Sequence, residues 1–410
     1  MKRVCLISPG HVASNPRLVK EANALIEAGF DVRVIAGDYA EFVRPLDEAL
    51  LSSVKWTCDR VELGNRPTYL WRKLKQKTAK FLFDCGLRNM YIAMWSHSAA
   101  SASLAQTASD AEADLYIAHC LAALPAAAIA AHKHSAKLGF DAEDFHVGEL
   151  ADIPENQTEI AIRDYIERKL LPQCDYLTAA SPMIASAYKD RYRVNIETIL
   201  NVFPLSEAPK LNDRQKQRSF INAPSLYWFS QTIGPGRGLE SIILAMGQMQ
   251  TQVSLYLRGI LASGYGEVLL QLAQNGGVSD RLHFLPSESP ENMARLASDY
   301  DVGLSLELNY PFNRSICLTN KIFTYLLAGL PVVLSETPAQ EDIAKVLSDA
   351  AILININDAQ SIAIELDMWL SNPLNLEKSR SKALRLGREI YNWDIEQKNF
   401  LKTIRQVLDA

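Results

Sequence analysis

Several features that would point to a particular class of protein are missing from this sequence. Its six cysteines are scattered along 410 residues, with no CxxC pair, so we interpret them as reduced core residues rather than disulfide or zinc ligands. There is no excess of positive charge, because 42 Lys and Arg against 47 Asp and Glu give a net charge of −5. This balance argues against a general nucleic-acid-binding protein.

Long apolar runs are also missing. The run near the amino terminus is interrupted by Pro9 and Gly10 before it reaches the roughly 7 to 15 residues of a signal-peptide core. Residues 115–131 are rich in alanine and contain a histidine and a proline, so they fall short of the about 20 apolar residues of a membrane span. We therefore expect a cytoplasmic protein that is soluble or bound peripherally at the inner face of the membrane.

What the sequence does contain is an alternation of strand and helix patterns along its whole length. Residues 4–7 are a short apolar run without polar alternation, which is typical of a strand covered on both faces. Such strands separated by helices predict parallel sheets with crossover helices. The strands that we expect are residues 3–8, 31–36, 115–118, 138–140, 176–179 and 196–200, and then 226–229, 254–257, 282–285, 302–306, 332–334 and 351–354.

A change of composition near residue 202 divides the chain. There the pattern gives way to a polar segment, residues 206–218, that is rich in Lys, Asp, Gln and Arg. We predict two tandem Rossmann-like α/β domains, residues 1–202 and 203–390, followed by a C-terminal helix within 391–410. Trp393, just before this helix, is expected to pack across a domain surface.

Polar residues that follow predicted strands are the first candidates for function, because ligands of open α/β sheets bind at the carboxyl ends of the strands. The loop after the first strand contains Gly10, Asn15 and Arg17. We expect Arg17 to meet a phosphate or carboxylate. Asn15 either lines the same site or caps the next helix, with Pro16 in the first position.

His119, Asp141 and Asp144 are further candidates in the first half of the chain. His119 follows the strand at 115–118, where it could donate to a sugar hydroxyl or move a proton, although a lone histidine can equally be structural. The two aspartates follow the strand at 138–140 and could lie on the acceptor side. Acidic groups there could also hold a metal or suit a helix dipole, but their spacing matches no metal motif, and we predict no metal site.

Two loops of the second half combine backbone freedom with positive charge. Gly236 and Arg237 lie in a segment with three glycines between a strand and a helix, where the backbone can approach an anion and the guanidinium can bind it. Thr319 and Asn320 begin another helix, and Lys321 stands in its first turn, where unpaired amides and the helix dipole favour an anion.

Together these loops predict a diphosphate-binding site rather than two unrelated turns. Glu307 follows the strand at 302–306, so we expect it to bind hydroxyls of the group that the diphosphate carries.

Residues 69–83 predict a basic amphipathic helix. Trp71, Leu74, Phe81 and Leu82 fall on one side of it, and basic residues spread over the other. Such a helix could lie on an anionic membrane or face a phosphate-bearing acceptor. It could equally pack its apolar stripe into the core.

The sequence resembles glycosyltransferases of the GT-B fold, and among them family 4, the retaining enzymes that use nucleotide-diphosphate sugars. The resemblance covers essentially the whole chain and is strongest at three places: Asn-Lys-Ile-Phe-x-Tyr-x-x-Ala-Gly-Leu-Pro-Val-Val at 320–333, Arg-Gly-Leu-Glu at 237–240 and Asn-Pro-Arg at 15–17. It implies that two Rossmann-like domains face each other across a cleft and that the C-terminal helix crosses back to the first domain. It also implies that Arg237 contacts the donor diphosphate and that His119 lies near donor and acceptor.

Two positions depart from the family pattern. Thr324 stands where members usually have a glutamate that holds the ribose hydroxyls, and Ser230-Gln231 stand near the place of the usual Gly-Arg. We expect Lys321 to supply the missing charge.

The function that the resemblance implies is transfer of a sugar from a nucleotide-diphosphate sugar to an acceptor hydroxyl with retention, in glycan, polysaccharide or glycolipid synthesis. The expected acceptor is a glycan, a lipid-linked sugar or a small molecule, and no metal or other cofactor is expected. His119 and Glu307 would be the catalytic residues. The alternatives are a nucleotide-sugar epimerase of the same fold and a non-catalytic subunit that binds nucleotide sugars.

Overall fold

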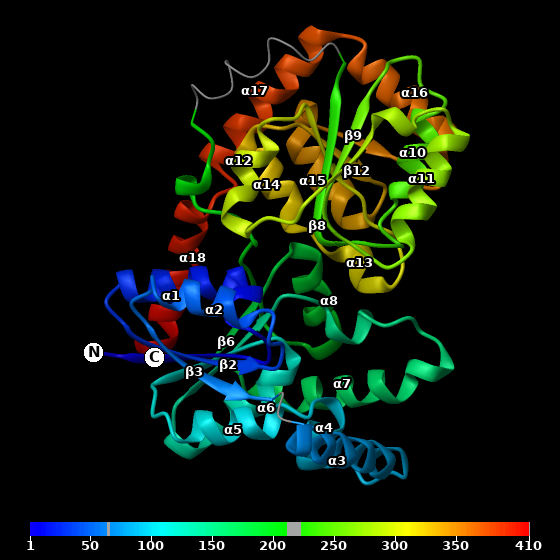
Figure 1. Cartoon of the computed structure of the whole chain (residues 1–410). Helices are drawn as coiled ribbons and strands as arrows, with labels where there is room; N and C mark the ends of the chain where they lie inside the picture. Colours follow the sequence, from blue (N-terminus) through cyan, green and yellow to red (C-terminus); the bar gives the residue numbers. More distant parts are fainter. Residues whose placement is uncertain (64–65, 211–222, 410) are drawn as a thin grey trace. The chain divides into compact units, whose positions relative to one another are not determined.

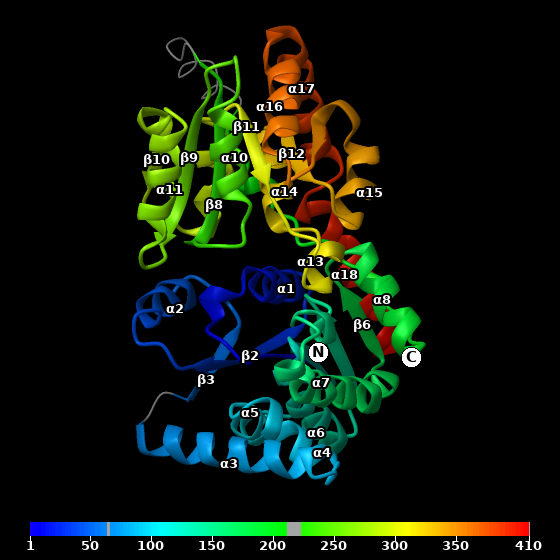
Figure 2. The same cartoon turned by 90° about the vertical axis from the view of Figure 1, so that its right-hand side faces the viewer.

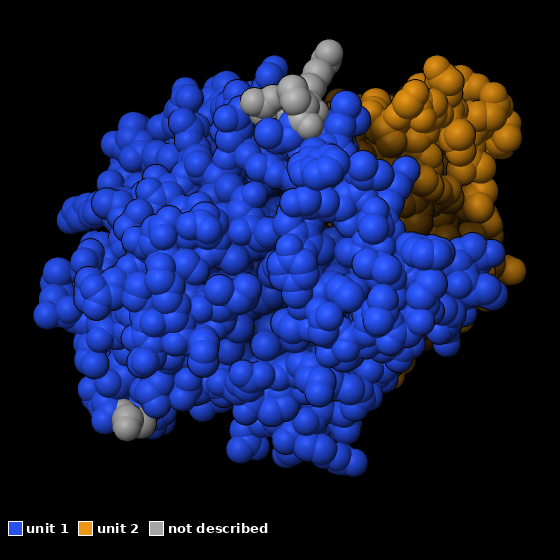
Figure 3. Space-filling model, turned by 90° about the horizontal axis from the view of Figure 1, so that it is seen from below, with its two compact units in different colours: residues 1–200, 311–313, 397–410 blue, residues 201–310, 314–396 orange. Residues whose placement is uncertain are grey.

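A computed structural model describes residues 1–63, 66–210 and 223–409, which form two compact α/β units (Figure 1). Unit 1 consists of residues 1–200, 311–313 and 397–410, and unit 2 of residues 201–310 and 314–396; Figure 3 colours them blue and orange. The observed division after residue 200 lies close to the expected one, but the assignment of 311–313 to unit 1 was not expected. Most of the polar segment 206–218 lies outside the described residues.

Unit 1 contains a parallel sheet of seven strands in the order β3-β2-β1-β4-β5-β6-β7. The central strands β1 and β4 are almost wholly buried, as their unbroken apolar runs predict. We did not predict β3, because this edge strand has an exposed, polar sequence with no apolar run. The strands are β1 Arg3–Ser8, β2 Asp31–Asp38, β3 Thr57–Glu62, β4 Leu115–His119, β5 Lys137–Ala142, β6 Tyr176–Ala179 and β7 Glu197–Thr198.

Helices connect and cover these strands. Asn15 caps the first of them, since its side chain accepts a hydrogen bond from the Leu18 amide and Pro16 occupies the first position. The capping interpretation of Asn15 is therefore confirmed. The helices are α1 Pro16–Glu27, α2 Arg44–Leu51, α3 Arg66–Asp84, α4 Met90–His97, α5 Ser101–Ser109, α6 Leu124–His134, α7 Gln157–Leu170 and α8 Pro182–Tyr192.

The last helix, α18 (Trp393–Asp409), belongs to unit 1 from residue 397 onward. Phe400 is fully buried and packs edge-to-face on Tyr176, with ring centroids 6.4 Å apart. Thr403 donates a 2.6 Å hydrogen bond to the Glu197 carboxylate. The expected return of the C-terminal helix to the first domain is confirmed. Trp393 itself lies in unit 2, where it is buried and its amide donates to the Phe203 carbonyl at 2.9 Å.

Unit 2 contains a parallel sheet of six strands in the order β10-β9-β8-β11-β12-β13, with a strand at each predicted place. The strands are β8 Ser225–Ile233, β9 Ser254–Leu261, β10 Leu282–Leu285, β11 Val302–Ser305, β12 Val332–Ser335 and β13 Ala351–Ile354. The helices are α10 Leu239–Met246, α11 Tyr265–Asn275, α12 Met293–Ala297, α14 Asn320–Ala328, α15 Pro338–Leu347, α16 Ala359–Leu370 and α17 Pro373–Glu389 (Figure 2). Helix α13 (Phe312–Ile316) begins in unit 1 and belongs to unit 2 from Arg314 onward. The predicted pair of parallel-sheet α/β domains is therefore confirmed.

Candidate functional site

The start of α14 offers unpaired helix amides, as the sequence predicts. Thr319 is the N-cap residue, but its side chain does not cap the helix; its hydroxyl lies 3.0 Å from that of Ser305 instead. The Thr319 side chain therefore leaves the amides of the first turn uncapped. A helix that starts in this way has the positive end of its dipole available to an anion.

Lys321 lies in this first turn and is 7% exposed. Its ammonium is 3.8 Å from a Glu307 carboxylate oxygen and 5.7 Å from the centre of the Trp228 ring. Burial lowers the pKa of Lys321; Glu307 opposes this shift, and the charge of Arg237 adds to it. A buried ammonium whose carboxylate partner is this distant would gain from an additional anion.

The turn before α10 presents Arg237 between two glycines in the left-handed region, Gly236 (φ 71°) and Gly238 (φ 69°). A Cβ atom on Gly238 would lie 2.6 Å from Ile356 Cδ1, so both conformation and space require glycine there. Arg237 is half-buried and makes no hydrogen bond or ion pair with any residue that the structure describes. Its donors are available to a ligand.

Arg314 is a third cation of this region that sequence reasoning missed. It lies in α13, and its guanidinium donates a 2.5 Å hydrogen bond to the Gly236 carbonyl. Like Arg237, it acts electrostatically to lower the pKa of Lys321. Its place between Glu307 and Lys321 in the sequence was the available signal. We call Arg237, Arg314 and Lys321 the cationic cluster.

Glu307 and Thr324 occupy fixed positions beside this cluster. Glu307 is buried, and its amide donates to the Ser335 hydroxyl at 2.6 Å. Thr324 is also buried, and its hydroxyl donates to the Asn320 carbonyl in the preceding turn at 3.1 Å. The Thr324 hydroxyl thus bonds within its own helix, and a threonine has no carboxylate with which to hold ribose.

In unit 1, Arg17 meets a carboxylate of the protein itself. It is 1% exposed and forms a two-bond pair with Asp141, Nε to Oδ2 at 2.5 Å and Nη2 to Oδ1 at 2.7 Å. A third donor reaches the Ile199 carbonyl at 2.7 Å. A buried guanidinium needs such partners, and those of Arg17 come from the protein. In this structure Arg17 is not presented to a phosphate, and Asp141 serves as its counter-ion.

His119 is fully buried among carboxylates. Its Nε2 lies 3.4 Å from Glu21, and its Nδ1 lies 3.4 Å from both Asp141 and Glu143. Burial lowers the pKa of His119, but Glu21, Glu143 and Asp141 outweigh this effect and raise the pKa to about 10. The ring is therefore a cation at neutral pH. Its catalytic role stays a prediction.

Glu21, His119 and Asp141 also place ligand atoms within 4.8 Å of one another, as a metal site requires. However, Arg17 donates to both oxygens of Asp141, and its Nε lies 3.5 Å from Glu21. The guanidinium therefore already provides a positive charge to these carboxylates. This arrangement favours a buried ion-pair network over a metal centre.

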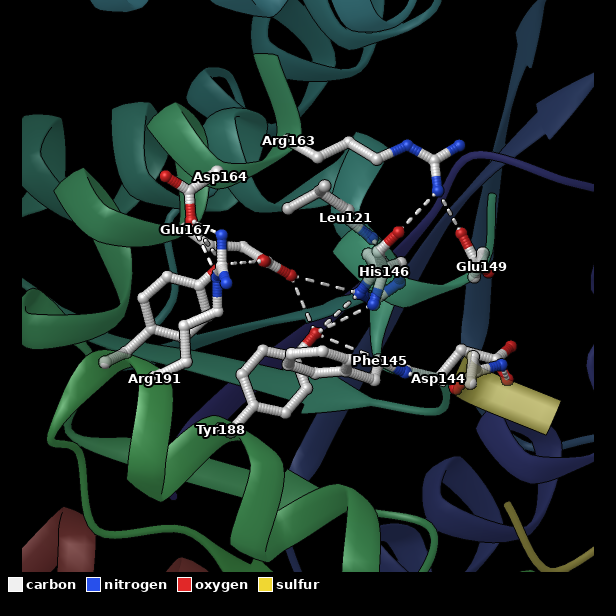
Figure 4. Close-up of polar contacts among 12 residues, drawn as sticks. Leu121, Asp144, Phe145, His146, Glu149, Arg163, Asp164, Glu167, Tyr188 and Arg191 are labelled. Carbon is white, nitrogen blue, oxygen red and sulfur yellow. Dashed lines mark hydrogen bonds and ion pairs between the residues drawn. The ribbon is translucent and has the colours of Figure 1, made fainter. Parts of the chain in front are cut away.

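Asp144 belongs to a neighbouring network of unit 1 rather than to an open site. Its carboxylate accepts a 2.6 Å hydrogen bond from the Asn313 side chain, whose carbonyl accepts from the Phe145 amide at 2.7 Å. Burial raises the pKa of Asp144. Figure 4 shows the adjacent His146 ring pointing toward the hydroxyl of Tyr188, 2.8 Å away. These contacts fix the loop after β5.

Gly10 remains in the loop after β1, where its amide donates to the Ser8 hydroxyl at 3.3 Å. Space for a Cβ atom is open around it. Gly10, Asn15 and Arg17 thus form part of the loop and helix start of unit 1, and their contact with a phosphate stays a prediction.

Comparisons with known proteins identify the fold. No model of a known protein family matches the sequence, and no curated protein matches it. Among solved structures, Anabaena HepE in complex with UDP-glucose has 16% identity and a TM-score of 0.72, over 99% of this chain and 100% of that one. The chain has the GT-B fold.

Two further structures share this fold. Sucrose-phosphate synthase from Thermosynechococcus elongatus has 15% identity and a TM-score of 0.72, over 100% of both chains. WaaG, a glycosyltransferase involved in lipopolysaccharide biosynthesis, has 12% identity and a TM-score of 0.66, over 97% of this chain and 98% of that one. At such identities the likeness concerns the architecture alone.

Proposed function

We propose that this chain is a glycosyltransferase that moves a sugar from a nucleotide-diphosphate sugar to an acceptor hydroxyl with retention of anomeric configuration. The observation that carries the proposal is the cationic cluster of unit 2, at the N-terminus of α14 and beside the Gly236 turn. Arg237 and Arg314 both act electrostatically on Lys321, and Glu307 is the carboxylate that lies beside it. The likeness to a GT-B protein solved with UDP-glucose supports a nucleotide-diphosphate sugar as the ligand.

The cluster suits the chemistry of the leaving group. As the bond between the anomeric carbon and the diphosphate oxygen breaks, negative charge grows on the diphosphate. Arg237, Arg314 and Lys321, together with the amides of Gly236, Thr319 and Asn320, would stabilise that charge. Because fixed cations supply this stabilisation, we infer that transfer is independent of a metal.

The acceptor hydroxyl would attack the anomeric carbon from the face of the leaving group, and its proton would pass to a diphosphate oxygen. Glu307 lies next to Lys321, where its carboxylate could accept hydrogen bonds from hydroxyls of the donor sugar. We retain His119 as the first-domain residue of the proposed catalytic set, acting as an imidazolium. The ribose would be bound without a carboxylate at Thr324.

Lys321→Met tests the donor site, because methionine keeps the buried stem and removes the charge. We expect uridine, guanosine and adenosine diphosphate sugars, tested in turn, to include one that raises the melting temperature of the wild type. A charge-assisted contact suggests that the variant binds this donor about 10- to 100-fold more weakly. The control is Lys345→Met, since the Lys345 side chain is 74% exposed in α15 of the same unit. Equal donor affinity in wild type and Lys321→Met would refute the phosphate assignment.

Product analysis then tests the reaction. Incubation of the stabilising donor with candidate acceptors should give a glycoside whose anomeric configuration, read by NMR, matches that of the donor. Turnover of the nucleotide sugar into its epimer without an acceptor would instead identify an epimerase. Binding without turnover of any kind would identify a non-catalytic subunit.

A further inference from the structure

Helix α3 exposes an unusual amount of apolar surface. Leu70, Trp71, Leu74 and Phe81 are 68%, 59%, 54% and 65% exposed, and Tyr91 at the start of α4 is 67% exposed. Singly exposed apolar residues are common, but a contiguous group of large ones marks a surface that binds something. Figures 1 and 2 both show α3 lying beside α4 at the edge of unit 1.

The exposed residues share one side of the helix. Leu70, Leu74, Lys77 and Phe81 are spaced at i, i+4, i+7 and i+11, whereas the buried residues of α3 include Ala79 and Phe83 on another side. Of the predicted stripe, Trp71, Leu74 and Phe81 are exposed and Leu82 is half-buried, so the interpretation that the stripe packs into the core is wrong. The helix packs against unit 1 through a smaller face that includes Ala79 and Phe83.

Positive charge surrounds the stripe. Residues 66–83 contain six Lys and Arg and no Asp or Glu. Lys73, Lys75 and Lys77 are exposed, and the Lys75 ammonium lies 5.6 Å from the Trp71 ring centre and 5.0 Å from that of Trp95. In such a pair the aromatic ring can lie in an apolar layer. The flexible lysine stem lets the ammonium stay at the polar boundary of that layer.

We propose that α3 and the start of α4 dock on an anionic lipid bilayer. We name the surface formed by Leu70, Trp71, Leu74, Phe81 and Tyr91, with Lys73, Lys75 and Lys77, the lipid-facing surface. An apolar stripe flanked by lysines matches both parts of such a bilayer, the acyl boundary and the negative headgroups. A second copy of this chain fits less well, because a twofold interface through α3 would bring two uncompensated positive surfaces together.

Attachment through this surface would be peripheral. None of the helices within the described parts of the chain combines the length and apolar character needed to cross a bilayer. The surface lies in unit 1 and shares no residue with the cationic cluster of unit 2, so the proposal is independent of the proposed function.

The test is co-sedimentation of the full chain with vesicles of phosphatidylcholine alone or with about 30% phosphatidylglycerol, at low and high salt. We expect binding to the anionic vesicles, weakened by salt. Replacing Lys73, Lys75 and Lys77 together by Gln should lower the partition coefficient about 100-fold, by about tenfold or less for each lysine. Replacing Leu74 and Phe81 together by Ser should abolish sedimentation with the anionic vesicles.

Matched controls are Lys345→Gln and Leu374→Ser, which change exposed residues of unit 2. Both should sediment like the wild type, and circular dichroism should show every variant folded. The proposal is overturned if the wild type ignores anionic vesicles, or if the α3 variants sediment as well as the controls. It is also overturned if sedimentation equilibrium shows a dimer that the α3 substitutions dissociate, because the occupant would then be a second copy.

Discussion

Gly238 lies in the turn that presents Arg237. Replacing it by alanine combines two destabilising effects, backbone strain and steric overlap. The left-handed backbone alone costs an alanine about 1–2 kcal/mol. In addition, the new Cβ would lie 2.6 Å from Ile356 Cδ1, 2.9 Å from Ile356 Cγ1 and 3.4 Å from Leu306 Cβ. Overpacking of this kind costs about 1–3 kcal/mol, so we expect Gly238→Ala to destabilise unit 2 by about 2–5 kcal/mol.

Two other glycines of unit 2 provide the comparison. Gly264 has φ 74° and no atom within 4 Å of a Cβ, so Gly264→Ala should show the backbone strain alone, about 1–2 kcal/mol. Gly234 has ordinary backbone, and the nearest atom to a Cβ is Ala262 Cβ at 3.6 Å. Gly234→Ala should therefore be neutral or stabilising by up to about 1 kcal/mol.

The assay is urea unfolding combined with hydrogen exchange of the β8 and α10 amides, because two units need not unfold in one step. Donor affinity should fall in the same order as stability, from Gly234→Ala through Gly264→Ala to Gly238→Ala. It should be weakest in Gly238→Ala because the displaced turn moves Arg237. The steric argument is refuted if Gly238→Ala costs no more than Gly264→Ala. A destabilised variant with unchanged donor affinity would instead refute the link between this turn and the site.

Further predictions concern the buried ions and the third cation. Asp141→Asn should destabilise the protein by about 3–5 kcal/mol in urea unfolding, because it leaves the Arg17 guanidinium buried without its carboxylate. The pKa of His119 is raised from 6.5 to about 10, so its stabilising contribution should be complete below pH 6.5 and lost as the pH rises through about 10. The stability difference between wild type and His119→Gln should therefore shrink between pH 7 and pH 10; a constant difference would contradict the charged ring. Arg314→Met should weaken donor binding about tenfold or more with little loss of apo stability, since the change removes a hydrogen bond to the half-buried Gly236 turn; calorimetric titration with the donor would measure this, and unchanged affinity would remove Arg314 from the site.

Much of the fold could be predicted because its signals are local. Unbroken apolar runs such as residues 332–334 are typical of buried parallel strands, and closely spaced glycines such as Gly236 and Gly238 indicate a turn. The strand at Thr57–Glu62 escaped prediction because it lies at the sheet edge, where one side needs no apolar residues.

The candidate site could be predicted only in part, because partners distant in sequence decide the state of a charge. Lys321 and Arg237 were found from helix-start and turn patterns, which are local. Arg17 had the right residue type in the right loop, but its contact with Asp141 is set by the pairing of strands across the sheet. Arg314 was missed because no spacing rule connects it with Gly236.

The composition of unit 1 has a consequence for the synthesis of the protein. Its residues 397–410, which bury Phe400 against Tyr176, are translated after all of unit 2. If unit 1 folds during translation, its seven-stranded sheet forms without this last helix while unit 2 is being made. Fragments cut after residue 200 would share this incomplete state, so the order of translation, and not only the order of strands, shapes how the first unit reaches its final form.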